Sequence, residues 1–285
     1  MLRKLCIFGV GLIGGSLSLA LRRAGYCREV VGCSRSESHL SRAVELNVID
    51  SYSLDPAEAV QDADMVLLAV PLGAMAPVCE SIRDSLAPDA VLTDVGSAKA
   101  SVLRAVTGAF GEAPAGFVPG HPIAGNEQSG VEAAFPELFQ GRRVILTPLV
   151  NTRQDARDKV RTMWEVAGAV VEEMGVEHHD EVLAATSHLP HLLAFGLVDS
   201  LARMGEREEI FHYAAGGFRD FTRIASSDPV MWRDICLANS EAILKVMTHY
   251  QQDLDSITRA VQEGDGERLL EIFQRAKAAR DRFCH

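Results

Sequence analysis

Short apolar runs alternate with segments of helical spacing along the first half of the chain. The clearest is a continuous apolar run from Met65 to Val70, which ends at Pro71. Other strand-like segments are found at residues 5–8, 29–33, 90–94, 116–119, 144–147 and 169–174, with a helix predicted at 154–167. Apolar strands that alternate with helices are typical of a parallel sheet covered on both faces. The pattern therefore predicts an α/β fold with a doubly wound parallel sheet.

The pattern changes after about Gly175, where strand-like runs end and helical spacing continues to the C-terminus. Residues 191–203 are apolar on nearly all sides, which predicts a buried central helix. Amphipathic spacing predicts further helices at 231–255 and 267–283. The second half is therefore expected to be all-helical.

Length and burial bear on domain organisation and assembly. A chain of 285 residues is long for one hydrophobic core. We therefore expect an α/β domain at residues 1–175 and a helical substrate and dimerisation domain at residues 176–285. A helix that is apolar on all sides needs more cover than one small helical domain supplies. This favours a homodimer, with a monomeric bundle as the alternative.

A glycine motif lies between the first predicted strand and an apolar helix that continues to about Ala24. Its sequence, GVGLIG at residues 9–14, is the dinucleotide-binding fingerprint with a strand before it and a helix after it. The glycines allow a tight turn, a close approach to a pyrophosphate and close helix–strand packing, and the helix N-terminus offers unpaired N–H groups. A glycine-rich turn without a ligand is the alternative. The predicted cofactor-binding residues here are Gly9, Gly11, Leu12, Ile13 and Gly14, with Val70 and Pro71 after a neighbouring strand.

The end of the second predicted strand bears on the choice between NAD and NADP. NAD-specific domains place an acid about 20 residues after the glycines, where it bonds the ribose 2′-hydroxyl. Ser34 occupies that place, and Arg35 and Ser36 follow it. These residues are predicted to bind a 2′-phosphate, so we expect NADP to be used at least as well as NAD. The alternative is a solvated Arg35 and a loop that accepts either cofactor.

Composition argues against several classes of partner. The formal net charge of −11 argues against nucleic acid and anionic membranes as default partners. The longest apolar stretch, residues 192–198, is far shorter than a membrane span, and residues 1–4 show no signal-peptide pattern. The six cysteines have no CxxC spacing, as expected of reduced thiols. We therefore expect a cytoplasmic protein that binds a small molecule.

Two segments after predicted strands carry candidate catalytic groups, in the region where doubly wound sheets bind ligands. Ser97 lies in DVGSAK at residues 94–99, where its hydroxyl is suited to bond a substrate or the nicotinamide; a helix cap is the alternative. His121 lies between a glycine and a proline, which predicts a rigid loop. An imidazole there is suited to accept a hydroxyl proton, with a structural histidine as the alternative. Glu127 is predicted to orient this loop or the substrate, unless it is a solvated acid.

Two pairs of histidines lie near the start of the helical half. His188 and His191 flank Pro190 at the start of the all-apolar helix. Because no carboxylate or cysteine completes a metal pattern, no metal site is predicted. One of the two is predicted to reach the active site and the other to satisfy a buried hydrogen bond. His178 and His179 lie among acids, which predicts a solvated face.

The segment FRDFTRIASSDPVMWRD at residues 218–234 is too polar and too interrupted to be a packing face. It sets arginines and aspartates among aromatic side chains, and arginine is suited to bind carboxylates through two hydrogen bonds. A nucleotide-binding fold does not require such a segment, so it points to the substrate.

In this order, the segments resemble the prephenate/arogenate dehydrogenase family of tyrosine biosynthesis, and most of all its bacterial cyclohexadienyl type. The matching pieces are GVGLIGGS at 9–16, DVGSAK at 94–99, GHPIAG at 120–125, TSHLPHLLAF at 186–195 and GGFRDFTRIASSDPVMW at 216–232. The resemblance implies a Rossmann domain followed by a helical dimerisation domain. It also implies oxidative decarboxylation of prephenate to 4-hydroxyphenylpyruvate, or of arogenate to tyrosine, with NAD or NADP as cofactor.

The resemblance further implies roles for individual residues. It makes His121 the catalytic base on the ring hydroxyl, with Ser97 assisting and His191 in the same site. Arg223 matches the residue that holds a substrate carboxylate. The other residues predicted to bind the substrate are Asp220, Trp232, Glu127 and His188.

Two other functions are weighed against this one. Dehydrogenases of the 3-hydroxyacid type usually rely on a lysine and an asparagine in the helical domain, whereas Lys245 is the only lysine between residues 178 and 276 and lies in an ordinary amphipathic segment. A non-catalytic dinucleotide sensor would keep the Rossmann half, but the presence of His121, Ser97 and Arg223 weighs against it. The sequence leaves prephenate and arogenate both open as substrates.

Overall fold

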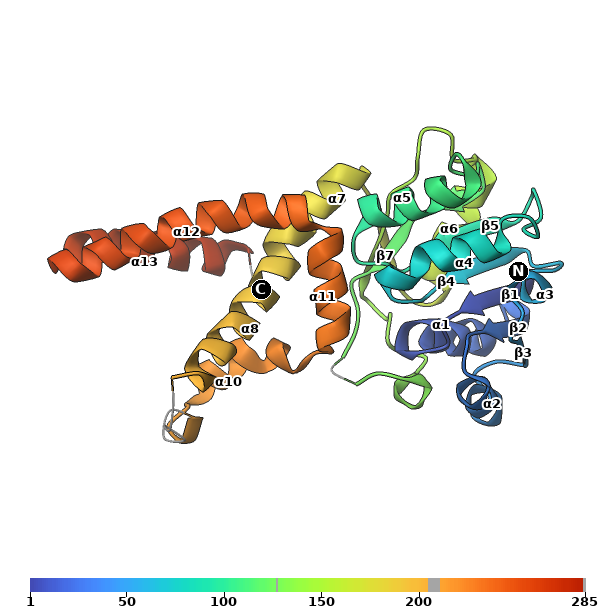
Figure 1. Cartoon of the computed structure of the whole chain (residues 1–285), viewed down its shortest axis with the longest axis horizontal. Coiled ribbons are helices and arrows are strands. Elements are labelled where there is room, and N and C mark those ends of the chain that lie inside the picture. The colour runs from blue at the N-terminus through green and yellow to red at the C-terminus, as the bar shows by residue number, and fades with distance from the viewer. Residues whose placement is uncertain (127, 205–210, 284–285) are drawn as a thin grey trace. The chain divides into compact units, whose positions relative to one another are not determined.

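A computed structural model of the chain describes residues 1–126, 128–204 and 211–283 (Figure 1). Compactness divides the chain into two units, Met1–Ser240 and Glu241–His285. The domain boundary predicted between residues 175 and 176 falls inside the first unit and stays a prediction.

A six-stranded parallel sheet forms the centre of the first half, with strand order β3-β2-β1-β4-β5-β6. This is the order of a Rossmann fold, so the predicted fold class is confirmed. The order reverses between β1 and β4, and ligands of such sheets bind beyond the strand ends at that point. The strands are β1 (Leu2–Phe8), β2 (Cys27–Cys33), β3 (Ser51–Ser53), β4 (Met65–Leu68), β5 (Val91–Asp94) and β6 (Phe117–Val118).

Helices cover both faces of this sheet (Figure 1). Buried residues of α1 (Leu12–Arg23), α2 (Glu37–Glu45) and α6 (Gln154–Val166) share one hydrophobic core. Buried residues of α3 (Pro56–Ala59), α4 (Met75–Ile82) and α5 (Lys99–Phe110) form a second core on the other face. Two single 3₁₀ turns, η1 (Leu72–Ala74) and η2 (Val131–Ala133), complete this region.

The strands predicted at 144–147 and 169–174 form a separate, three-stranded sheet. In it, β8 (Arg143–Leu146) pairs antiparallel with β7 (Gly120–Pro122) and parallel with β9 (Val170–Glu173). His121 lies on β7, opposite Ile145. The prediction that His121 lies on a loop is therefore wrong, because a strand ladder holds its backbone.

Every described element after β9 is helical, as predicted. The elements of the first unit are α7 (Val176–Leu183), the π-helical turn η3 (Ala184–His188), α8 (Leu189–Ala202), α10 (Gly216–Thr222), the 3₁₀ turn η4 (Arg223–Ser226) and α11 (Pro229–Ala238). In α8, only Leu189 and Ala194 are buried, and Leu197 is 37% exposed. The predicted burial of this helix is therefore wrong for the single chain, whose own elements leave most of the apolar surface of α8 partly open.

The helix predicted at 231–255 is two helices. α11 ends at Ala238, Asn239 is its C-cap, and α12 (Ser240–Glu263) begins directly after Asn239. Asn239 is buried, and its side-chain amide donates to the backbone oxygen of Asp180 at 2.8 Å. This tertiary hydrogen bond interrupts a stretch whose spacing alone reads as one helix. In the second unit, a turn at Gly264 leads from α12 to α13 (Gly266–Phe283).

One helical segment, Val176–Ala202, has the length and composition of a membrane span, with a mean hydropathy of 1.2. The sequence prediction considered only uninterrupted apolar residues and so did not anticipate it. The core helix of a water-soluble protein can have the same composition. Within this segment, His179 and Asp180 are buried and bond to His121 and Lys99, whereas most of α8 is not buried in the single chain.

Candidate active site at the strand ends

The glycine loop after β1 has the geometry that dinucleotide binding requires. Gly9 has a φ of +88°, and a Cβ there would lie 2.4 Å from the carbonyl oxygen of Ala69. A Cβ on Gly14 would lie 2.6 Å from the carbonyl oxygen of Gly9, so helix and strand meet too closely for a side chain. Nothing would lie within 4 Å of a Cβ on Gly11. Of these three glycines, only Gly11 therefore leaves its backbone open to a phosphate.

The N-terminus of α1 is suited to bind an anion. Its N-cap is Gly11, which makes no side-chain cap, and the first turn contains no acidic residue. The N–H groups around Leu12 and Ile13 therefore keep the partial positive charge of a helix start. Val70 lies against the same loop, since its Cγ1 would be 3.2 Å from a Cβ on Gly9, and the exposed Pro71 follows it. These residues fit the diphosphate of a dinucleotide.

The loop after β2 holds the residues predicted to contact the adenosine ribose. The Ser34 hydroxyl accepts from the N–H of Ser36 at 3.3 Å. The Ser36 hydroxyl caps α2 by accepting from the N–H of His39. Arg35 is exposed between the two serines. Ser36 thus has a structural role, and the cofactor roles of all three residues stay predictions.

A buried ion pair holds the two catalytic segments together. Lys99 and Asp94 are both fully buried, with Lys99 Nζ 2.5 Å from Asp94 Oδ2. Lys99 Nζ also donates to the carbonyl oxygen of Gly120, and Asp94 accepts from the N–H groups of Gly96 and Gly120. Burial lowers the pKa of Lys99, and the Asp94 carboxylate opposes that shift. The backbone on either side of Ser97 and the residue before His121 are therefore fixed relative to each other.

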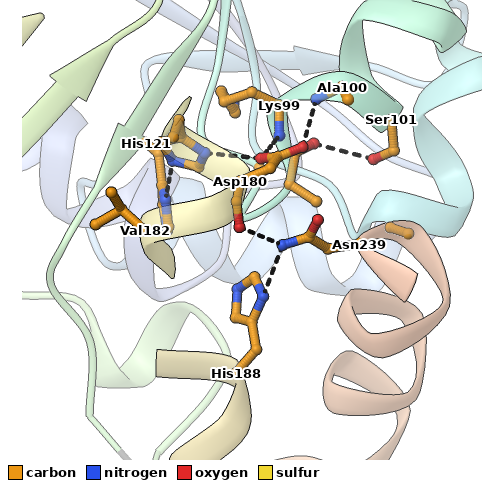
Figure 2. A network of polar contacts seen from close by, with 12 residues as sticks. Lys99, Ala100, Ser101, His121, Asp180, Val182, His188 and Asn239 are labelled. Atoms are coloured by element: carbon orange, nitrogen blue, oxygen red, sulfur yellow. Dashed lines mark hydrogen bonds and ion pairs between the residues drawn. The ribbon is translucent and has the colours of Figure 1, made fainter. Parts of the chain in front are cut away.

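Ser97 is half-buried in the loop between β5 and α5. The N-cap of α5 is Ala98, and no side chain within the loop caps the helix. The alternative in which Ser97 is only a helix cap is therefore wrong. The Asp180 carboxylate instead accepts from the N–H groups of Lys99 and Ala100, at 2.7 and 2.9 Å (Figure 2).

His121 is the first member of a buried chain of hydrogen bonds. Its Nδ1 lies 2.9 Å from Nε2 of His179, and Nδ1 of His179 lies 2.8 Å from Oδ1 of Asp180. Burial lowers the pKa of His121 well below its ordinary 6.5, and His179 and Lys99 lower it further. His121 is therefore a neutral base at neutral pH.

The prediction that His178 and His179 form a solvated face is wrong for His179. His178 is exposed, but His179 is fully buried. The acidic neighbours suggested a solvated surface, yet the buried positions of α7 are Val176, His179, Asp180 and Leu183. This i, i+3, i+4, i+7 spacing is the signature of a buried helix face. The same spacing was the signal available in the sequence.

His188 satisfies a buried hydrogen bond, as predicted for one of the two histidines that flank Pro190. It is 1% exposed, and its Nδ1 lies 3.1 Å from the side-chain amide of Asn239 (Figure 2). Burial lowers the pKa of His188 to about 4. His188 therefore stays neutral and joins η3 to the end of α11.

His191 lies in a more open environment than His188. It is half-buried, and its Nδ1–H donates to the carbonyl oxygen of Ser187 at 2.8 Å. Its ring stacks on Trp232, with the ring centroids 3.6 Å apart. Burial and the nearby positive charge of Arg223 lower its pKa, while the hydrogen bond to Ser187 opposes them. The structure thus brings His191, Trp232 and Arg223 together.

The polar segment at 218–234 folds as three short helical pieces. Arg223 begins η4, which contacts α8, and Asp220 is exposed on α10 three residues earlier. Trp232 is buried on α11, and Asp228 caps that helix by accepting from the N–H of Met231 at 2.7 Å. Arg223 itself is exposed.

Glu127 lies outside the described residues, so its predicted role stays a prediction. Among residues 1–126, 128–204 and 211–283, no group of three or more His, Cys, Asp or Glu side chains has the arrangement of a metal site.

Two family models match the chain. Residues 17–173 match the prephenate dehydrogenase nucleotide-binding domain, and residues 175–275 match the prephenate dehydrogenase dimerisation domain. Together they cover most of the chain.

Curated relatives match over almost the whole chain. A cyclohexadienyl dehydrogenase from Zymomonas mobilis is 40% identical, with 98% of this chain and 95% of that protein aligned. A prephenate dehydrogenase from Bacillus subtilis is 36% identical, with 96% of this chain and 74% of that protein aligned.

A solved structure agrees in fold at comparable identity. The prephenate dehydrogenase from Aquifex aeolicus, in complex with hydroxyphenyl propionate and NAD⁺, superposes with a TM-score of 0.91 at 37% identity, covering 98% of each chain. The family models, the relatives and this structure agree with one another, and the chain belongs to the prephenate dehydrogenase family.

Proposed function

We propose that the protein oxidatively decarboxylates prephenate, arogenate or both, as a dehydrogenase of tyrosine biosynthesis in the cytoplasm. The names of its relatives support this substrate class, since they include cyclohexadienyl, prephenate and arogenate dehydrogenases. The observation that carries the proposal is His121, a buried neutral histidine fixed beside the Ser97 loop at the carboxyl ends of the strands.

The reaction needs one base, which takes up a proton and later returns it, so that no proton is consumed or released overall. When bound, the oxidised nicotinamide accepts the hydride that leaves the hydroxyl-bearing ring carbon. His121 accepts the proton of that hydroxyl, so that a carbonyl forms, and Ser97 is assigned a hydrogen bond to the same oxygen. Loss of CO₂ across the ring sends the electron pair of the broken C–C bond into the ring and to this oxygen. His121 then returns its proton, which yields the phenol. General-base help of this kind is typically worth roughly 10²–10⁴-fold in rate.

Binding the substrate carboxylates requires a positive charge and hydrogen-bond donors, which we assign to the helices that follow β9. Arg223 is assigned to one carboxylate, with His191 and Trp232 forming the adjoining wall of the site. Asp220, Glu127 and His188 are assigned supporting roles around that wall. Arg223 need only orient the substrate, because tight ground-state binding alone does not speed the chemical step.

The apolar surface left open in the helical half supports a homodimer. Residues of α8 and of the second unit remain exposed although they are large and hydrophobic, among them Leu197, Leu244, Leu254, Val261 and Phe273. Sedimentation at micromolar concentration is expected to show twice the mass of the chain. A species of single-chain mass alone would refute the dimer.

The experiment that tests the function uses purified protein with prephenate or arogenate and each cofactor. Reduced nicotinamide and the aromatic product are measured together, because their equal yield identifies oxidative decarboxylation. His121→Asn is expected to lower kcat by roughly 10²–10⁴-fold with little change in cofactor affinity. A near-normal kcat in this variant would show that His121 is not the base.

A further inference from the structure

Asp180 is held in one orientation by groups that can only donate to it. The N–H groups of Lys99 and Ala100 bind its two carboxylate oxygens, and the Asn239 amide binds its backbone oxygen (Figure 2). Burial would raise the pKa of Asp180, but the hydrogen bonds from His179, Ala100 and Lys99 outweigh it and keep the pKa below its usual value. The carboxylate is therefore ionised and can only accept from His179.

The direction of the next hydrogen bond follows from this one. Because Asp180 Oδ1 is an acceptor, Nδ1 of His179 must carry the proton that joins them. Burial lowers the pKa of His179 despite the Asp180 carboxylate, so its ring is neutral and Nε2 keeps a lone pair. That lone pair faces Nδ1 of His121 at 2.9 Å. The two histidines therefore form a hydrogen bond only when Nδ1 of His121 carries a proton and donates it to Nε2 of His179.

We infer that Asp180 and His179 are positioning residues that hold His121 in the tautomer with Nδ1 protonated and Nε2 free to accept the substrate proton. The inference deepens the proposed function and rests on it for the role of His121 as base. A neutral histidine with the opposite tautomer would present an N–H to the hydroxyl and be unable to take its proton. His179 is fully buried and contacts His121, so it acts through His121.

The tautomer is measured directly by long-range ¹H–¹⁵N NMR correlation in the wild-type protein labelled at histidine. The His121 signals are assigned by their loss in His121→Asn. We expect Nδ1 of His121 to be protonated and Nε2 to have the shift of an unprotonated ring nitrogen. Protonation at Nε2 of the neutral ring would overturn the inference, and this measurement requires no variant at position 179 to fold.

Kinetics separate positioning from a general effect on structure. His179→Leu removes the acceptor and is expected to lower kcat roughly 10- to 10³-fold, with KM for prephenate and Kd for the cofactor unchanged. His179→Gln retains an acceptor oxygen and is expected to recover part of that loss. His178→Gln, at the exposed neighbouring position, is the matched control and should match the wild type. Normal kcat in His179→Leu would overturn the inference.

The two proposals fail in different ways. An Nε2-protonated His121, together with an inactive His121→Asn variant, would overturn the positioning chain and leave His121 as the base. A normal kcat in His121→Asn would overturn the proposed role of His121, whichever tautomer the spectrum shows.

Discussion

The rings of His191 and Trp232 lie almost parallel, with their planes 18° apart. His188, three residues before His191, meets the same tryptophan edge-on and is bonded to Asn239 instead. The two histidines therefore share a neighbour but face different environments, one half-open and one closed.

This contrast predicts different effects for matched substitutions. His191→Asn is expected to raise KM for prephenate several-fold with the thermal midpoint nearly unchanged, because His191 faces the proposed substrate site. His188→Ala is expected to lower the thermal midpoint, because it leaves the Asn239 amide without one of its partners. Steady-state kinetics and thermal unfolding of both variants check this assignment, which reversed effects would contradict.

Arg223 is expected to anchor a substrate carboxylate. Losing a charge-assisted, two-point contact costs about 2–5 kcal/mol when the partner charge is left buried. Arg223→Ala should therefore raise KM for prephenate at least about tenfold while the cofactor Kd stays constant. Arg219→Ala, at an exposed arginine in the preceding helix, serves as the comparison. An unchanged KM in Arg223→Ala would make Arg223 a structural residue.

Arg35 is expected to favour NADP. The residue at the position of the usual acid is Ser34, so nothing there repels a 2′-phosphate. NADP should be used at least as well as NAD, and Arg35→Ala should lower kcat/KM for NADP by about 1–3 kcal/mol more than for NAD. The values of kcat/KM for both cofactors decide the matter. A wild-type preference for NAD of more than about tenfold would contradict the prediction.

The Lys99–Asp94 pair is expected to show strong energetic coupling. Lys99→Met leaves Asp94 charged and buried, which typically costs about 3–5 kcal/mol. Adding Asp94→Asn removes that charge, so the double variant should lose less stability than the sum of the two single variants. Chemical denaturation of the four proteins measures the coupling. Additive losses would mean that the ion pair makes no net contribution.

Stability is expected to fall on acidification between about pH 6.5 and pH 4. The folded-state pKa of His188 is about 4, below its ordinary 6.5. In this window the unfolded chain binds a proton at His188 that the folded chain does not. The free energy of unfolding therefore keeps its full value above pH 6.5 and decreases as the pH falls toward 4. The loss of unfolding free energy caused by His188 approaches about 3 kcal/mol near pH 4.

Substitution of His188 tests that origin of the pH dependence. His188→Asn is expected to flatten the decline, whereas the exposed control His178→Gln should leave it unchanged. Unfolding free energies measured at pH 7, 6, 5 and 4 supply the comparison. If the unfolding free energy of His188→Asn falls with pH as steeply as that of the wild type, another group takes up the proton.

The fold and the cofactor loop could be predicted because their signals are local. Gly9 and Gly14 each have a backbone or packing constraint that only glycine meets, and both glycines fall within one six-residue motif. Likewise, the apolar run that begins at Met65 marks a strand buried on both faces. Signals of this kind do not depend on what the rest of the chain does.

The positioning chain could not be predicted in the same way because its signals are remote. His179 meets His121 across 58 residues, and Asp180 meets Lys99 across 81. Acidic neighbours made His179 read as a surface residue; the spacing of α7 indicates its buried face, but only the tertiary contact shows that His121 is its partner. The break at Asn239 has the same origin, since its amide bonds residues 59 and 51 positions away.

The cap that Asp180 supplies to α5 ties the proposed proton transfer to residues that follow the nucleotide-binding segment of the chain. The glycine loop lies at residues 9–14 and the match to a nucleotide-binding domain covers residues 17–173, whereas His179 and Asp180 come only after both. The residues that orient the proposed base are therefore translated after the whole of the segment that forms the cofactor loop. A product that ends before Val176 would keep the glycine loop and His121 but would lack both residues that hold the His121 ring.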